Sequence, residues 1–571
     1  MPFDETQLNL GITSEETIEE SAEPTIEEPV EDEAALLERL GITEDQAAST
    51  VRNHEGEPAF LRGAKERTIQ VMTTNTLDGT FYASKSEVRE GTVEALESMM
   101  QADPEFLAKA AVYARNNGLL QLAPILGLAV LSKAEDKKWF KAAFPHIICT
   151  PDNLRDFVSV CKSGEIRTGL GGVAYEAVKE WLSTISEFHA IKYSGNTRSE
   201  RKNGTVVNKF SLKDMVTLAR PKPENEDMDE RFRWITRGAA KGAEIVHNPR
   251  IKAYEALKKA ETDEERCALI KEGGLPWEVV IPSVPHMSPE LWEALMTQMP
   301  YMALLRNINN LSKNGVLKSE DNVEYLVGRL TDAEAIKKAK ILPFRLYEAY
   351  VAYENMYGED SRIADALEEA LEASFVNMPD LPGEVAIGSD VSGSMGGTIS
   401  EKGVTRYIDI CGVFTGALLK KASGRVHALP FNYDVVKVDV SGQDRILTTA
   451  NKIVQKCGGG TALGAPIENL MKRGQSVDTF IGITDNEDWA YGSGRAVNGS
   501  FLNSWRKYRA SVNPNAQAYL VRIDPYAESV APQGEPGVHF IYGWSDNVPA
   551  YIARDAAGKK NQVEEVEAVQ L

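Results

Sequence analysis

The spacing of apolar residues changes near Pro382, and this change divides the chain into two kinds of fold. From about Asn53 to Asn377, apolar residues recur every three or four positions in runs such as EGTVEALESMMQADPEFLAKAAVYARNN, which is the spacing of amphipathic helices. After Pro382, short apolar runs such as EVAIGSD and DTFIGITD alternate with helical runs such as TRYIDICGVFTGALLKKA. The sequence therefore predicts a multidomain protein, an all-α part followed by an α/β part.

The two parts predict different architectures. The long helical part has no strict sequence repeat, and it favours an α-solenoid over a single bundle. Strands and helices that alternate indicate a doubly wound parallel sheet with helices on both faces. We expect an acidic disordered tail over residues 1–52, a helical domain over 53–378, an α/β domain over 379–556 and a flexible tail over 557–571.

Composition limits the classes of protein to which the chain can belong. A chain of 571 residues is too long for one hydrophobic core. No apolar run reaches the roughly 18 residues that a membrane span needs, and the N-terminus MPFDETQLNL lacks the pattern of a secretory signal. The five cysteines are scattered without CxxC spacing, so we expect reduced thiols and a cytoplasmic protein.

Charge is distributed unevenly along the chain. The net charge is -21, but residues 1–53 hold 15 acidic and 2 basic residues, and residues 191–223 hold 8 basic and 2 acidic ones. The overall acidity therefore does not exclude an anionic partner, because the local charge decides such contacts. Within the acidic tail, LGITSEE (10–16) is echoed by LGITEDQ (40–46). Two nascent helices and a duplicated docking peptide both fit this echo.

Hard oxygen ligands follow two of the predicted strands and precede one predicted helix. Asp390, Ser392 and Ser394 follow EVAIGS, Thr461 follows three glycines, and Asp485 follows TFIGIT. Ligands of open α/β sheets bind at the carboxyl ends of the strands, and Mg²⁺ prefers oxygen donors with only one or two carboxylates. Each motif alone also fits a helix cap, a turn or a strand end. Together, in order, they predict a magnesium site.

Basic residues near the middle of the chain are candidates for RNA phosphate contacts, with Tyr193 and Phe210 nearby for base stacking. The ten candidates are Lys192, Arg198, Arg201, Lys202, Lys209, Lys213, Arg220, Lys222, Arg306 and Lys313. The stretch GNTRSERKNG is expected to be an exposed loop. A solvated surface without RNA explains the same charges, and Arg306, inside an apolar helix, equally fits a structural pair with a carboxylate.

Catalytic motifs give no support for an enzyme. The sequence has no GxSxG, HExxH or GxxxxGK[ST] pattern, and its histidines are dispersed. A single metal ion with mainly hydroxyl ligands is a poor match for two-metal phosphodiester chemistry. We therefore expect a non-enzymatic protein.

The motifs together resemble a known pair of domains. The α/β part resembles a von Willebrand factor type A (vWA) domain with its metal-ion-dependent adhesion site, and the helical part resembles the TROVE module. The stretches that carry the likeness, besides DVSGSM, are TTNTLDGTFY (73–82), MALLRNINNLSKNGVL (302–317) and KKAKILPFRLYEAY (337–350). In this order the two domains resemble the Ro autoantigen family, and the likeness covers about residues 53–555.

The resemblance implies a function. Proteins of the Ro family are monomeric rings of HEAT-like repeats that the vWA domain closes. Single-stranded 3′ ends of misfolded or processing noncoding RNAs enter a basic hole, and a Y RNA binds the outer surface. Such proteins act in RNA quality control, as chaperones or as tethers for exonucleases, without covalent chemistry. The matching metal residues are Asp390, Ser392, Ser394, Thr461 and Asp485, and a partner's carboxylate usually completes the shell of the ion.

One helix departs from the family pattern. The stretch GGVAYEAVKEWL (171–182) matches a helix that carries several basic residues in members that bind Y RNA, but here Lys179 is its only base. This departure puts a Y-like RNA on the outer surface in doubt. An alternative function also stays open, a protein-adhesion scaffold in which the metal site binds an acidic residue of a partner.

Overall fold

The computed structural model describes residues 50–571 except 53–57, 62, 74–84, 119, 165, 195–198, 203–204, 209, 240–243, 340, 342, 357–360, 375–379, 399–404, 486–487, 489–499, 524–528, 533, 543–551 and 553–561. Most of the predicted acidic tail, with its LGIT echo, lies outside the described residues. Its last three residues differ from the prediction, because Thr50–Arg52 forms strand β1, which pairs antiparallel with β2 (Pro58–Phe60).

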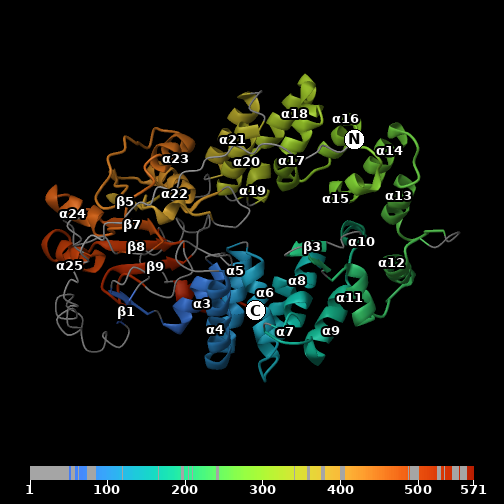
Figure 1. Ribbon diagram of the computed structural model, residues 1–571, viewed down its shortest axis with the longest axis horizontal. Helices are drawn as coiled ribbons and strands as arrows, with labels where there is room; N and C mark the ends of the chain where they lie inside the picture. Colours follow the sequence, from blue (N-terminus) through green and yellow to red (C-terminus); the bar gives the residue numbers. More distant parts are fainter. Residues whose placement is uncertain are drawn as a thin grey trace, which may run out of the picture. The chain divides into compact units, whose positions relative to one another are not determined.

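The helical part contains helices in close succession (Figure 1). The first are α3 (Ala64–Thr73), α4 (Lys85–Ala102), α5 (Pro104–Asn116), α6 (Leu122–Leu131), α7 (Lys138–Ile147), α8 (Pro151–Lys162), α9 (Gly171–Leu182) and α10 (Glu187–Ser194). After the hairpin β3–β4 (Ser199–Lys202 and Thr205–Asn208) come α11 (Leu212–Ala219), α12 (Glu226–Arg237), α13 (Pro249–Leu257), α14 (Asp263–Gly273), α15 (Trp277–Val280), α16 (Pro289–Met296), α17 (Tyr301–Lys313), α18 (Glu320–Leu330), α19 (Ala333–Ala339), α20 (Pro343–Met356) and α21 (Ser361–Ala373).

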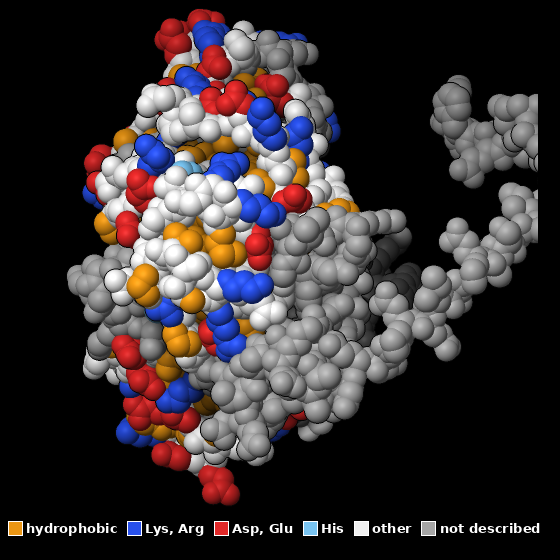
Figure 2. All heavy atoms as spheres, turned by 90° about the vertical axis from the view of Figure 1, so that its left-hand side faces the viewer, with side chains coloured by type: hydrophobic (Ala, Val, Ile, Leu, Met, Phe, Trp, Pro, Cys, Tyr) orange, Lys and Arg blue, Asp and Glu red, His pale blue; other side chains and the backbone are white. Residues whose placement is uncertain are grey.

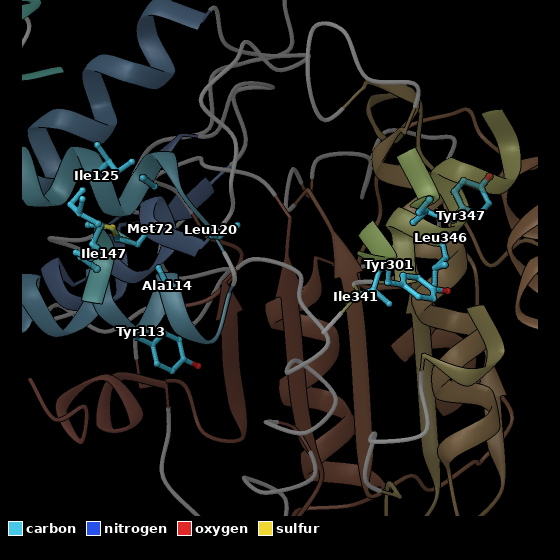
Figure 3. Packing of buried hydrophobic residues seen from close by; sticks show 14 of the residues in the cluster. Met72, Tyr113, Ala114, Leu120, Ile125, Ile147, Tyr301, Ile341, Leu346 and Tyr347 are labelled. Atoms are coloured by element: carbon cyan, nitrogen blue, oxygen red, sulfur yellow. The ribbon is translucent and has the colours of Figure 1, made fainter. Parts of the chain in front are cut away.

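Side-chain caps set the starts of many of these helices. Thr150 accepts a hydrogen bond from the backbone N–H of Asn153 at the start of α8, and Ser211 and Asp214 form a capping box at the start of α11. Such caps satisfy backbone donors that the first turn leaves without a partner. The apolar faces of neighbouring helices then pack on one another. In Figure 3, Met72, Ile125 and Ile147 from different helices gather in one part of this core.

The α/β part is built on a parallel sheet. Its elements are β5 (Val385–Ser389), the short helix η3 (Ser394–Gly396), α22 (Tyr407–Lys421), β6 (Val426–Ala428), α23 (Ile446–Val454), α24 (Ala465–Lys472), β7 (Thr479–Thr484), α25 (Phe501–Ser511), β8 (Gln517–Arg522) and β9 (Val538–Tyr542). The described strands pair in the order β6-β5-β7-β8-β9, all parallel. Helix α22 packs on α23 and α24 on α25, and Figure 1 shows the two pairs on different sides of the strands. The predicted combination of many helices and a doubly wound parallel sheet is confirmed.

The strand order also fixes where a ligand site belongs. From β5 the chain moves to β6 on one side and then returns to β7 on the other. The order of the strands therefore reverses between β5 and β7, and at such a switch point the flanking loops diverge and leave a crevice at the carboxyl ends. Every residue of β5 and β7 is buried. The loops after these two strands carry Asp390 and Asp485.

Two local predictions are wrong. The stretch predicted as an exposed basic loop includes the antiparallel hairpin β3–β4, in which Arg201 is opposite Val206. The predicted flexible tail contains α27 (Gln562–Glu567), because Val566 is fully buried and the helix packs on α5 and α3. In the described part of the chain, no helix has both the length and the apolar character needed to cross a membrane.

Candidate metal and RNA-binding sites

Asp390 lies at the end of the buried strand β5 and is itself fully buried. Its backbone N–H donates to the carbonyl of Ile483 in β7, at 3.0 Å. The carboxylate accepts from the backbone N–H of Ser392 at 2.8 Å through Oδ1 and from the Thr484 hydroxyl at 2.7 Å through Oδ2. The two bonds fix the orientation of the carboxylate at the switch point of the sheet.

The electrostatics of Asp390 follow from this position. Burial raises the pKa of its carboxyl to about 6, because a charge removed from water is disfavoured. The hydrogen bonds from Ser392 and Thr484 favour the charged form and oppose this rise in pKa, but burial outweighs them. A bound cation would compensate the buried negative charge.

The two serines of the motif lie together. Ser392 and Ser394 are both buried, and their hydroxyl oxygens are 3.1 Å apart. Ser394 begins the short helix η3, and this turn brings the second hydroxyl back beside the first. Alternate positions after β5 thus present a carboxylate and two hydroxyls from one short loop.

The glycine loop before Thr461 is bonded to the loop after β5. The N–H of Gly393 donates to the carbonyl of Gly459 at 2.9 Å, and the N–H of Gly458 donates to the carbonyl of Val391 at 2.8 Å. Gly459 has φ +90, and a Cβ at this position would lie 3.0 Å from the side chain of Asn432. Glycine is therefore required there both by conformation and by space.

Thr461 provides a test of whether these residues fit a metal ion. Its side-chain oxygen is buried and has no hydrogen-bond partner in the described part of the chain. A buried hydroxyl without a partner costs free energy unless a ligand satisfies it. Asp485, also buried, follows β7 directly. A set of three hydroxyls and two carboxylates suits a hard cation such as Mg²⁺.

The ligand types at the site differ from those of typical zinc sites. The described residues contain no group of three or more His, Cys, Asp and Glu side chains that could hold an ion. Zn²⁺ in proteins is usually bound by such nitrogen, sulfur and carboxylate clusters. The structure thus brings together the loops that carry the five predicted ligands, while their role as ligands stays a prediction.

Two supporting residues were not predicted. Thr484 orients the Asp390 carboxylate, as described above. Asp488 is buried and accepts hydrogen bonds from the N–H groups of Leu463 at 2.9 Å and Phe501 at 2.8 Å. It therefore joins the segment after Thr461 to the start of α25. Thr484 has a sequence signal, a hydroxyl beside the acid at a strand end, but the role of Asp488 depends on which backbone donors reach it.

The predicted RNA-binding residues divide into three groups. Arg198 and Lys209 lie outside the described residues, and only the backbone is described for Arg201 and Lys202. Lys192 pairs with Glu278 at 2.9 Å, so its charge is already compensated. The third group is exposed and forms no ion pair with the described residues. It consists of Lys213, Arg220, Lys222, Arg306 and Lys313.

One expectation about these side chains is corrected. Arg306 is exposed on α17, so it needs neither a structural carboxylate nor an anion. The Lys162 ammonium lies 4.6 Å from the ring centre of Phe210, and the Lys192 ammonium lies 5.7 Å from that of Tyr193. Base stacking on these two rings stays a prediction.

Arg220 has an unusual backbone conformation. It ends α11 with φ 46 and ψ 56, and it is the only non-glycine residue with positive φ in the described part of the chain. The Tyr175 hydroxyl hydrogen-bonds the carbonyls of Leu218 at 3.2 Å and Ala219 at 3.0 Å, which holds this end of α11. An arginine where glycine is preferred costs roughly 1 kcal/mol or more, which points to a use for its side chain.

Comparisons with known proteins agree with this architecture. Residues 275–360 match the TROVE domain family, and residues 384–554 match the Ro60 vWA domain family. The chain is 26% identical over 466 residues to the RNA-binding protein RO60 of Deinococcus radiodurans, which covers 77% of this chain and 84% of that one. It is 24% identical over 477 residues to the RNA-binding protein RO60 of Caenorhabditis elegans, covering 73% and 72%.

A solved structure shares the fold. The crystal structure of the Deinococcus radiodurans RO (RSR) protein superposes with a TM-score of 0.64 at 21% identity, over 87% of this chain and all of that one. The names of the two relatives are those of RNA-binding proteins and not of enzymes, in agreement with the non-enzymatic prediction. The chain is thus similar to the Ro family, with a match to the TROVE domain followed by a match to the Ro60 vWA domain.

Proposed function

We propose that this protein binds RNA, capturing single-stranded ends of small or misfolded noncoding RNAs in a basic ring that the vWA domain closes. Support comes from the names of the Ro60 relatives and from the exposed cations of the helical part. The observation that carries the proposal is the group at the end of α11. There, exposed Arg220 adopts a strained conformation, with exposed Lys213 and Lys222 nearby in sequence.

The α11 group can be tested by charge removal. In a Lys213→Gln/Lys222→Gln variant, affinity for a labelled single-stranded RNA should fall, and the log–log slope of affinity against salt should decrease by about 1.4, as for the loss of two phosphate contacts. The matched control is Lys456→Gln/Lys507→Gln, two exposed lysines of the vWA domain. If both variants keep the original slope, the α11 group does not contact RNA.

The proposal includes a divalent cation, Mg²⁺, held by Asp390, Ser392, Ser394, Thr461 and Asp485. The buried Thr461 hydroxyl without a partner supports this part. When bound, the ion would supply a positive charge that can accept a carboxylate from a partner protein. The protein-adhesion scaffold therefore remains a second candidate function, and both functions can operate in one molecule.

The metal site has its own test. Addition of millimolar MgCl₂ should raise the melting temperature of the chelator-treated protein, since an ion that binds only the folded state stabilises it. Thr461→Val should leave the metal-free protein equally stable or more stable, because it removes a buried hydroxyl that has no partner. The same substitution should abolish the effect of Mg²⁺. A full Mg²⁺ response in this variant would exclude Thr461 as a ligand.

The remaining parts of the proposal concern partners and location. Y-like RNA, an exonuclease tethered through the metal site or the acidic tail, and a monomeric state follow from the family likeness alone. The five cysteines are all free thiols, which suits a cytoplasmic location.

A further inference from the structure

A groove of about 780 Å³ lies between α7 and α9, two helices that Figure 1 shows side by side. Its lining is mostly apolar and includes Phe144 and Pro145 of α7 with Tyr175 and Trp181 of α9. A volume of this size accommodates a small ligand or several side chains of a peptide. Neither the metal site nor the predicted RNA contacts use this groove.

The polar tips of the two α9 aromatics point into the protein. Trp181 Nε1 donates to the carbonyl of Ile148 at 2.7 Å. The Tyr175 hydroxyl bonds the carbonyls at the end of α11, as described above. Because these tips are already satisfied, the rings contribute aromatic surface to the groove and no hydrogen-bond donor. Aromatic surface without donors favours apolar groups and cations over anions.

Two glutamates and one lysine line the groove. Glu176 and Glu180, one turn apart on α9, are exposed at its edge. Glu176 pairs with Lys179 at 3.2 Å on the surface, whereas Glu180 forms no ion pair with the described residues. Among the described residues that line the groove, Lys141 is the only cation. Glu180 is therefore a carboxylate at this edge with which a cation of a ligand can pair.

We propose that the α7–α9 groove binds a segment of a partner protein in which an arginine or lysine lies beside apolar side chains. The apolar side chains would fill the space against Phe144 and Trp181. The cation would lie over an aromatic face and within reach of Glu176 and Glu180. This is the chemistry by which grooves bind amphipathic peptides. The proposal is independent of RNA capture and of the metal site.

The experiment starts from an unbiased probe. A displayed library of random dodecapeptides is selected on the full-length protein, and enriched peptides are synthesised and titrated by fluorescence anisotropy. We expect the enriched sequences to combine Arg or Lys with aromatic or aliphatic residues. Their affinity should fall about tenfold for Glu176→Lys/Glu180→Lys, as expected when charge contacts are reversed. Both glutamates are exposed, so the fold should tolerate this change.

A pair of glutamates on another helix provides the control. Glu264→Lys/Glu272→Lys reverses two exposed glutamates of α14 and should leave peptide affinity unchanged. Three results would overturn the proposal. In the first, no enriched peptide loses affinity in the α9 variant; in the second, the enriched peptides are acidic or lack cations. In the third, a structured RNA competes for the groove and loses affinity when Lys141→Glu is introduced.

Discussion

Asp390 connects the chemistry of single residues to the fold. Its carboxylate is oriented by Ser392 and Thr484, yet it is fully buried, and burial raises its pKa to about 6. A buried carboxylate with this pKa destabilises the fold when it is ionised without a partner. The same carboxylate favours the binding of any cation that can reach it. The same position that makes Asp390 a good ligand therefore makes the metal-free protein sensitive to pH.

In the metal-free protein, the contribution of Asp390 to the free energy of unfolding should decrease as the pH rises from about 4 to about 6. In this range the folded chain retains the Asp390 proton while the unfolded chain loses it, so the free energy of unfolding decreases with pH. A shift of about two pK units corresponds to roughly 3 kcal/mol. Urea denaturation in the presence of a chelator would measure it.

Asp390→Asn is the matched control for this pH dependence. The amide does not titrate, so the component assigned to Asp390 should disappear, while the contribution of all other carboxyl groups stays the same. Identical pH dependence in the two proteins would show that Asp390 keeps an ordinary pKa.

Arg220 allows strain and charge to be separated. Arg220→Gly should stabilise the protein by about 1 kcal/mol relative to Arg220→Ala, because only glycine adopts positive φ at low cost. Both substitutions remove the charge, so both should weaken RNA binding equally. Chemical denaturation and an RNA-binding titration of the pair provide the two readouts. Equal stability of the two variants would argue against strain, and unchanged RNA affinity would argue against a contact.

The five candidate ligands could be predicted because each follows a strand or precedes a helix in an alternating pattern. Side-chain chemistry and position in the sequence were enough to place Asp390, Thr461 and Asp485 in these loops, while their role as ligands stays a prediction. The supporting roles of Thr484 and Asp488 could not be predicted in the same way. They depend on which groups from distant segments come within hydrogen-bond distance, and only the folded chain determines that.

At the scale of elements, the helices and strands with strong periodicity were predictable, and short polar elements were not. Strands β5 and β7 are buried along their whole length and are mostly apolar. The sequence of hairpin β3–β4 contains several charged residues, and these favoured the prediction of a loop. The Asn-Gly dipeptide between the two strands is nevertheless typical of hairpins. Helix α27 has the sequence QVEEVE, whose few apolar residues suggested a solvated tail.

Helix α27 is nevertheless attached at several points. Val566 is fully buried, Glu565 accepts from the Tyr113 hydroxyl at 3.1 Å, and Glu567 pairs with Lys65 at 2.6 Å. The Lys109 ammonium also donates to the carbonyl of Glu567, at 2.9 Å. These contacts join the end of the chain to α3 and α5, near its beginning.

Val566→Ala should lower the free energy of unfolding by about 2 kcal/mol, because it removes two fully buried methyl groups. Gln570→Ala, an exposed change in the same terminal segment, should have almost no effect. The two variants are compared by urea denaturation. A loss below the error of that measurement for Val566→Ala would mean that α27 is not firmly docked.

At the scale of the whole molecule, the TROVE part and the vWA part are linked by polar contacts near the domain boundary. The Tyr347 hydroxyl donates to Asp409 at 3.2 Å, the backbone N–H of Ile446 donates to Glu372 at 2.6 Å, and Lys420 pairs with Glu372 at 3.1 Å. Burial raises the pKa of Tyr347, so this hydroxyl stays a donor at neutral pH. These contacts attach α20 and α21 to α22 and α23 of the vWA part.

Charge is mixed on one face of the molecule. Figure 2 shows acidic and basic side chains interspersed over the described part of the face that it views, and neither sign covers that face. The proposed RNA contacts are local, at groups such as the one at the end of α11. Such binding depends on salt, because each phosphate contact releases counterions.

The most direct test of the central claim is a salt titration of binding to an RNA with a structured body and a single-stranded 3′ tail. The account predicts nanomolar affinity that falls steeply as salt rises and weakens strongly when the tail is removed. Weak binding that is indifferent to the tail would contradict the capture of RNA ends by this protein.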